Sequence, residues 1–135
     1  MKKLLVAPTN LGITLEEAKG FLRVEFDDDD DTITQLIKSS TLLAQNQIGQ
    51  QLTEATYIEA LQSFSQQINL FSPVKSITSV KYYDENNVLQ TIDSSNYTLL
   101  DFGLPHFLVF KADYEFPSLY DRKDALQITF VCGME

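Results

Sequence analysis

The densest group of potential metal ligands in the sequence is a run of five aspartates, Asp27, Asp28, Asp29, Asp30 and Asp31. Hard cations such as Ca²⁺ bind clustered carboxylate oxygens, so this run is a candidate cation site. An EF-hand calcium loop beginning at Asp27 fails, because Thr32 stands where glycine is needed and Lys38 where the bidentate glutamate belongs. The alternative is a solvated helix start, since negative charge near a helix N-terminus contributes roughly 0.3–1 kcal/mol per residue. We adopt the helix start and expect no tight metal site.

Other side chains with catalytic or ligand chemistry are isolated in the sequence. His106 has no second histidine or cysteine nearby, which is typical of a structural or surface residue. The single cysteine, Cys132, excludes an internal disulfide and is most simply a small buried hydrophobe. The sequence contains no glycine-rich phosphate loop and no HExxH, CxxC or GxSxG motif. Nineteen acidic residues allow many carboxylate pairs for glycoside hydrolysis, but the chain has no tryptophan to stack a sugar ring. We therefore expect neither an enzyme nor a bound cofactor.

The charge of the chain limits its partners. A net charge of −9 argues against a nucleic-acid-binding protein, which needs a basic face, and against docking on an anionic membrane. The N-terminal MKKLLVAP has an apolar patch from Leu4 to Ala7 that is too short for a secretion signal, and Pro8 ends it. No run in the sequence approaches the roughly 20 apolar residues of a spanning helix. We expect a cytoplasmic protein that does not contact membranes.

Two helices are predicted on either side of the aspartate run. Thr14 followed by Glu17 is a capping box, and Ile13 and Ala18 are spaced for a hydrophobic staple. After the aspartates, apolar residues recur at helical spacing until Gly49, which supplies a stop signal. We expect this face to turn toward the core or toward a subunit interface; its main residues are Ile33, Leu36, Ile37, Leu43 and Ile48.

The rest of the chain has the composition of β-structure. Asp84 to Asn87 separates two polar-ended strands, which is a hairpin signal, and residues 112–123 have the composition of a loop. The predicted strands are Tyr57 to Leu61, Ile68 to Phe71, Ile77 to Tyr83, Tyr97 to Leu100, Phe107 to Lys111 and Leu126 to Cys132. The predicted fold class is α+β: an N-terminal helical pair followed by a mostly antiparallel β region. We expect a single domain, 1–135, with a helical part at 1–52 and a β-rich part at 53–135.

Three segments together resemble one protein family. ITLEEAKGFLRVEFDDDDDTITQLIKSSTLLAQNQIGQQL holds a helix, an acid-rich hinge and a longer helix. SPVKSITSVKYYDENNVLQTIDSSNYTL is a proline-led strand and hairpin, and DALQITFVCGME is a closing strand. Their order and spacing are similar to those of the head–tail connector (head-completion adaptor) proteins of long-tailed bacteriophages and prophages. The resemblance spans about Pro8 to Gly133.

The resemblance implies a structural assembly protein without enzymatic activity. Such a protein forms a ring that contacts the portal protein on one side and a neck or tail completion protein on the other, and DNA passes through it unread. An acidic lumen would repel the DNA phosphates and let the genome slide. The candidate interaction residues are Asp27 to Asp31, Ile33, Leu36 and Ile37. The expected location is the host cytoplasm during assembly and then the virion, or the cytoplasm for a prophage product.

Longer members of that family continue past the final strand into further helices that contribute to subunit contacts. For a chain ending at Glu135 we expect a monomer or weak oligomer in isolation, with rings forming at high concentration or on a portal. A second hypothesis is a monomeric module that binds a peptide or small ligand through aromatic-rich loops. Tyr114, Phe116 and Tyr120 lie in the long polar segment where such a site would form.

Overall fold

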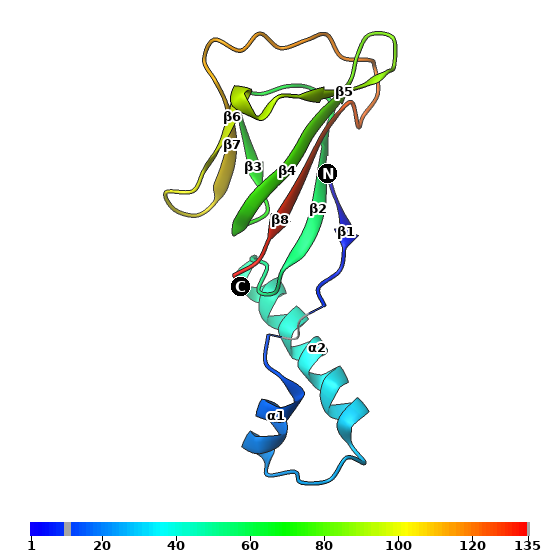
Figure 1. Cartoon of the computed structure of the whole chain (residues 1–135), viewed down its shortest axis with the longest axis vertical. Helices are drawn as coiled ribbons and strands as arrows, with labels where there is room; N and C mark the ends of the chain where they lie inside the picture. Colours follow the sequence, from blue (N-terminus) through cyan, green and yellow to red (C-terminus); the bar gives the residue numbers. More distant parts are fainter. Residues whose placement is uncertain (10–11, 135) are drawn as a thin grey trace.

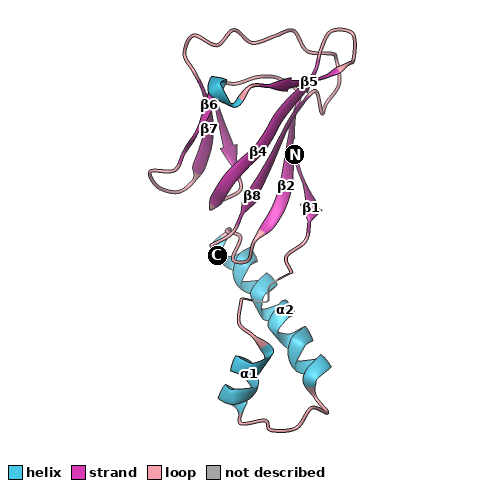
Figure 2. Ribbon diagram, in the orientation of Figure 1, coloured by secondary structure: helices cyan, strands magenta, loops and turns pink. Residues whose placement is uncertain are grey.

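The computed structural model describes residues 1–9 and 12–134, and it has a helical pair joined to a larger β part (Figure 1). Both helices lie at one end of an elongated molecule, and the strands lie at the other (Figure 2). The described elements are β1 (Lys2–Val6), α1 (Leu15–Leu22), α2 (Asp30–Ile48), β2 (Ala55–Leu61), β3 (Gln67–Leu70), β4 (Val74–Tyr83), β5 (Leu89–Ile92), the short 3₁₀ helix η1 (Ser94–Asn96), β6 (Tyr97–Leu100), β7 (His106–Phe110) and β8 (Leu126–Cys132). The predicted α+β class is confirmed.

The strands form two antiparallel sheets. The first has the order β1-β2-β8-β4-β5, and the second has the order β3-β7-β6. The closing strand β8 lies at the centre of the first sheet, where it pairs with β2 on one side and β4 on the other. Its alternating sequence explains this place, because every second side chain is buried from Leu126 to Cys132 while the residues between them are partly exposed. The hairpin predicted around Asp84 to Asn87 is the β4–β5 hairpin.

One hydrophobic core lies between the two sheets. Phe130 and Ile128 come from the first sheet, while Leu108 and Phe110 come from the second, and all four are essentially inaccessible to solvent. Aromatic rings extend this core at one end: Phe64 stacks on Phe116 with ring centroids 4.8 Å apart. This packing is the main source of apolar burial in the molecule.

The N-terminal residues form a strand that we did not predict. Leu4 pairs with Tyr57 of β2, and the free amino group of Met1 lies 3.0 Å from the carboxylate of Glu59. The strand β1 is an edge strand with every residue exposed, so its sequence lacks the alternation that marks a half-buried strand. The predicted helical part at 1–52 therefore also contributes one strand to the β part.

A polar network joins α2 to the sheets. The side-chain oxygen of Gln45 accepts a hydrogen bond of 2.9 Å from the backbone N–H of Leu52. Gln51 is buried; its amide group donates to the carbonyl of Thr53 and its oxygen accepts from the hydroxyl of Tyr57. Because these polar groups are buried or partly buried and are paired, the network favours one arrangement of the junction.

Candidate functional site

The acidic hinge begins beside a well-capped helix. The Thr14 hydroxyl accepts a hydrogen bond of 3.0 Å from the backbone N–H of Glu17, and the Glu17 carboxylate accepts one of 3.4 Å from the backbone N–H of Thr14. These two bonds are the predicted capping box, and it is confirmed. The helix ends at Arg23 in the left-handed conformation, after which the chain turns into the aspartate run.

One lysine holds the aspartate run against α1. The ammonium group of Lys19 lies 2.8 Å from a carboxylate oxygen of Asp27 and 2.7 Å from one of Asp30. The hydrogen bonds that Lys19 donates to Asp27 and then to Asp30 raise the pKa of Lys19, and the bond that Asp27 accepts from Lys19 lowers the pKa of Asp27. Asp30 and Asp31 lie in the first turn of α2, so the predicted helix start is confirmed.

The cation alternative finds no support in the geometry of the run. Within residues 1–9 and 12–134, no group of three or more histidine, cysteine, aspartate or glutamate side chains is arranged to hold a metal ion. The run instead turns from a loop into α2, with Asp29 as the residue before the helix. The absence of tight calcium binding stays a prediction for calorimetry.

The helical pair has a very small core of its own. Its buried side chains are Ala18, Ile33 and Ile37, with Leu15 and Val24 packed beside them. Two helices can bury only the faces that they turn toward each other, so the outer flanks of both stay open. Ile33 and Ile37, which were predicted to face the core or a subunit interface, face this small core.

Other residues of the predicted stripe are exposed. Leu36 is 59% exposed, and Leu43 and Ile48 are also exposed, so of the two positions predicted for this face, the core or a subunit interface, these three do not occupy the core. They share a helical period with Ile33 and Ile37, but the buried contact between the two helices is too narrow to include them. Their role in a subunit interface stays a prediction. Further exposed apolar side chains of the pair are Ile13, Phe21, Leu22, Phe26 and Leu42.

The sequence of α2 carries unusually little charge for an exposed helix. After Asp30 and Asp31, the single charged residue in the helix is Lys38. A helix that stays in water normally has a charged outer face, whereas buried interface centres are depleted of charge. The composition of α2 is therefore typical of a helix that contacts another protein.

An apolar groove runs between α1 and α2. Its volume is about 520 Å³, and its lining includes Ala18, Leu22, Leu36, Ala44 and Met134. None of the described residues that line it is charged. Met134 reaches the groove because β8 leads directly into it, where the backbone N–H of Met134 donates a hydrogen bond of 3.1 Å to the carbonyl of Leu52.

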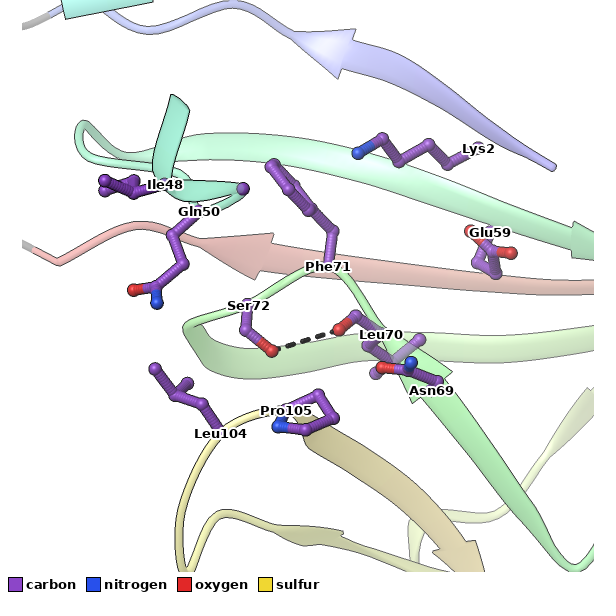
Figure 3. A pocket seen from close by; sticks show the side chains of 11 residues that line it. Lys2, Ile48, Gln50, Glu59, Asn69, Leu70, Phe71, Ser72, Leu104 and Pro105 are labelled. Atoms are coloured by element: carbon purple, nitrogen blue, oxygen red, sulfur yellow. Dashed lines mark hydrogen bonds between the residues drawn. The ribbon is translucent and has the colours of Figure 1, made fainter. Parts of the chain in front are cut away.

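A second pocket, of about 630 Å³, lies where α2 meets the sheets (Figure 3). Its lining mixes apolar residues with Lys2 and Glu59, but both charges already have partners. The ammonium group of Lys2 lies 3.2 Å from the ring centroid of Phe71, and Glu59 binds the amino group of Met1. This pocket therefore offers neither charge freely to a ligand.

The aromatic residues proposed for a ligand-binding loop are mostly used in packing. The Tyr114 ring stacks on Phe110 with centroids 5.5 Å apart, and Phe116 stacks on Phe64. Burial of the Tyr114 hydroxyl raises its pKa. Phe116 and Tyr120 are nevertheless exposed, and the backbone N–H of Tyr120 donates to the carbonyl of Tyr83. These contacts fasten the 112–123 segment over the end of the core, and the rings of Tyr114 and Phe116 take part in that packing.

The isolated histidine and cysteine have the structural roles expected of them. The Nδ1 atom of His106 accepts a hydrogen bond of 2.9 Å from the backbone N–H of Val74, and the backbone N–H of His106 donates to the hydroxyl of Ser72. Cys132 is fully buried, and burial raises the pKa of its thiol to about 11. A thiol of this kind is unreactive at neutral pH.

Sequence reasoning missed the exposed apolar turn between β6 and β7. Phe102 is 95% exposed at the turn between β6 and β7, and Leu104 in the same turn is also exposed. The sequence signal that could have found it is the segment FGLP between two predicted strands, where a large apolar residue lies in a turn and not in a strand. In the part of the chain that the structure describes, no helix is both long and apolar enough to cross a membrane.

Comparisons with known proteins agree with this geometry. Residues 12–108 match the family model described as phage gp6-like head-tail connector protein. A search of curated proteins found no match. Two similar solved structures come from the neck of an empty gene transfer agent particle, computed with C6 symmetry, and from the virion of a native one.

The fold is shared with these structures almost completely. The chain from the empty-particle neck has a TM-score of 0.80 and 14% identity, and the match covers 98% of this chain and 71% of that one. The chain from the native virion has a TM-score of 0.78 and 16% identity, with the same coverage. A third, from a native neck computed with C12 symmetry, has a TM-score of 0.75 and 16% identity and covers 98% and 69%. Sequence identities this low show that the fold is shared and nothing more. The match to the family model, in contrast, spans residues 12–108, which is most of the sequence. The chain therefore belongs to the phage gp6-like head-tail connector protein family.

Proposed function

We propose that this chain is the subunit of a ring in the neck of a phage or phage-like particle, between the portal vertex and the tail. The family match over residues 12–108 is the observation that carries the proposal. The symmetry of the neck structures with the same fold, C6 and C12, agrees with a ring of repeated subunits. In this proposal residues 1–135 act as one domain, and the protein is structural and carries out no chemistry.

The exposed apolar surface of the helical pair supports a role in assembly. A soluble monomer rarely leaves a contiguous apolar surface uncovered, yet the groove between α1 and α2 and the side chains of Leu36, Leu43 and Phe21 are open. In a ring, a neighbouring subunit or the portal would cover them. Ile33 and Ile37 are part of the lining of the groove, and Asp27 to Asp31 lie where the chain passes from α1 to α2.

DNA would pass through such a ring without being read. The net charge of −9 makes attraction to phosphates unfavourable, so a lumen lined by carboxylates would not retain the genome. The proposed partners are the portal protein and a neck or tail completion protein. Assembly would occur in the host cytoplasm, and the finished ring would stay in the virion.

The test is to mix the purified chain with the portal protein of the same genome and to image the mixture by electron microscopy. We expect an additional ring of density on the tail-facing side of the portal. Removal of the gene from the particle-producing genome should leave DNA-filled heads without tails, and supplying the gene separately should restore tailed particles. Normal tailed particles without the gene would contradict the proposal.

A further inference from the structure

We propose that the turn between β6 and β7 of one chain inserts Phe102 into the groove between α1 and α2 of a second copy, and that this contact joins neighbouring subunits. The inference rests on the ring of the proposed function and names the surfaces that would form it. The occupant of the groove is thus a second copy of this chain, and its contacting segment is residues 102–104.

The exposed side chain of Phe102, which we call the knob, is held by a fixed turn. Its side chain is 95% exposed, so it contributes almost nothing to the folding of its own chain. The turn that carries it is fixed at both ends, because Leu100 pairs with Phe107 and the backbone N–H of His106 donates a hydrogen bond of 2.9 Å to the Ser72 hydroxyl. The turn projects to the side of the β part, away from the core (Figure 1). A large ring on a fixed turn loses little entropy when it binds.

The groove has the size and chemistry to accept this ring. Its volume of about 520 Å³ lies within the roughly 300–1,000 Å³ of pockets that bury a small organic molecule. Ala18 and Ala44 keep it open, and Leu22, Leu36 and Met134 supply apolar walls. Burial of a phenylalanine removes on the order of 150–250 Å² of surface from water.

The charge of the chain favours this contact over other contacts between two copies. Two copies that each carry −9 repel one another, and a contact between uncharged surfaces brings no further like charges together. The groove has no charged residue among those described in its lining, and the turn segment Phe102, Gly103, Leu104 and Pro105 is uncharged. Two other pockets formed by the described residues have charged side chains in their linings, Lys2 and Glu59 in one and Lys38 in the other. The knob and the groove therefore form a matched pair of uncharged surfaces.

The positions of the knob and the groove determine whether the contact is heterologous or isologous. The knob lies on the β part and the groove on the helical pair, so each chain offers one of each on different surfaces. A contact between unlike surfaces is heterologous, and it closes into a ring when the rotation per subunit divides a full turn.

The first experiment uses two loss-of-contact variants with matched controls. Phe102→Ser removes the knob, and Val88→Ser makes the same kind of change at the exposed tip of the β4–β5 hairpin. Ser40→Phe fills the groove, and Ser39→Phe adds the same ring to the adjacent exposed position of α2, which does not line it. Circular dichroism and thermal unfolding confirm that all four fold. In sedimentation over a concentration series, we expect Phe102→Ser and Ser40→Phe to associate at least tenfold more weakly than the controls and the natural chain.

Mixing the two defective variants gives a sharper result. The Phe102→Ser chain keeps its groove and the Ser40→Phe chain keeps its knob, so a mixture can form one contact per pair and should stop at a one-to-one dimer. The double variant Gly103→Cys with Ser40→Cys keeps the Phe102 ring, because no atom lies within 4 Å of a Cβ added at Gly103. Treated with a short bifunctional maleimide, it should form a ladder of cross-linked multimers, whereas each single variant stops at a dimer at most. Buried Cys132 does not interfere.

These outcomes separate this inference from the proposed function. If the natural chain forms rings or binds the portal and the Phe102→Ser chain does so equally well, the knob contact is wrong and the neck function stands. A double-cysteine chain without a ladder at the highest soluble concentration also overturns the contact. If the natural chain neither binds a portal nor is needed for tailed particles, the proposed function is wrong.

Discussion

In the part of the chain that the structure describes, the two sheets bury eleven side chains in one core, whereas the helical pair buries three. The sheets face each other and exclude water from the space between them. The two helices have a groove where a third layer would pack. The difference indicates a division of work: the β part stabilises the chain, and the helical pair leaves apolar surface exposed, as the proposed role in assembly requires. Each of the following changes tests that division.

The largest expected effect comes from the centre of the sheets. Phe130→Ala removes a fully buried ring from β8 and should lower the free energy of unfolding by about 3–5 kcal/mol. Leu36→Ala removes a similar apolar side chain from α2, but that side chain is 59% exposed, so the change should stay within about 0.5 kcal/mol. Chemical denaturation of both variants measures the contrast. An equal loss of stability would show that the helical pair has a larger core than the structure gives it.

Two glycines sharpen the comparison through the backbone. Gly133 has a φ of +138°, and a Cβ there would lie 2.8–2.9 Å from backbone atoms of Thr53 and Glu54. Gly133→Ala should therefore destabilise the chain by about 1–3 kcal/mol. Gly20 lies inside α1 with no neighbouring atom within 4 Å of an added Cβ, so Gly20→Ala should stabilise that helix by about 0.5–1 kcal/mol.

The two glycine variants are read by different measurements. Denaturant unfolding reports the loss at Gly133, because the end of β8 belongs to the main core. Amide hydrogen exchange in α1 reports the gain at Gly20, because a weakly packed pair opens locally before the sheets do. If Gly20→Ala instead raised the global free energy of unfolding by its full amount, the pair and the sheets would unfold together and the division would fail.

The elements differed in how well their sequence revealed them. Thr14, Glu17 and Gly49 act through neighbours in the sequence, so local chemistry was enough to place both helices. The alternation from Leu126 to Cys132 was likewise sufficient for β8. The edge strand β1 was missed because its order comes from pairing with β2, more than fifty residues away, and not from its own pattern.

The candidate site was harder to predict than the elements that build it. Periodicity groups Ile33, Leu36 and Ile37 on one side of α2, but it does not say how much of that side a partner helix covers. The exposure of Leu36 follows from the absence of a third layer over the pair, which is a tertiary property. Phe102 is part of no periodic pattern. It stands out only because its side chain has almost no contact within its own chain, which the sequence does not reveal.

The smallest expected effect concerns the ion pairs of the acidic hinge. The ammonium group of Lys19 reaches Asp27 and Asp30, and Lys19→Met keeps most of the aliphatic stem while removing the charge. We expect faster amide exchange in α1 at neutral pH and no measurable change in the sheets. The control is Lys75→Met, which breaks the ion pair with Glu54 in the β part and should leave α1 unchanged.

The pH dependence of that effect identifies its cause. Because the pKa of Asp27 is lowered, its bond contributes above the ordinary aspartate pKa and is lost as the pH falls through the lowered value. The pKa of Lys19 is raised, so its contribution is complete below the ordinary lysine pKa and is lost as the pH rises through the raised value. The difference in α1 exchange between the natural chain and Lys19→Met, compared at each pH, should therefore be present at pH 7 and shrink toward zero in strong acid. A difference that persists in acid would mean that Lys19 acts through packing, and the hinge would then depend on apolar contacts as the sheets do.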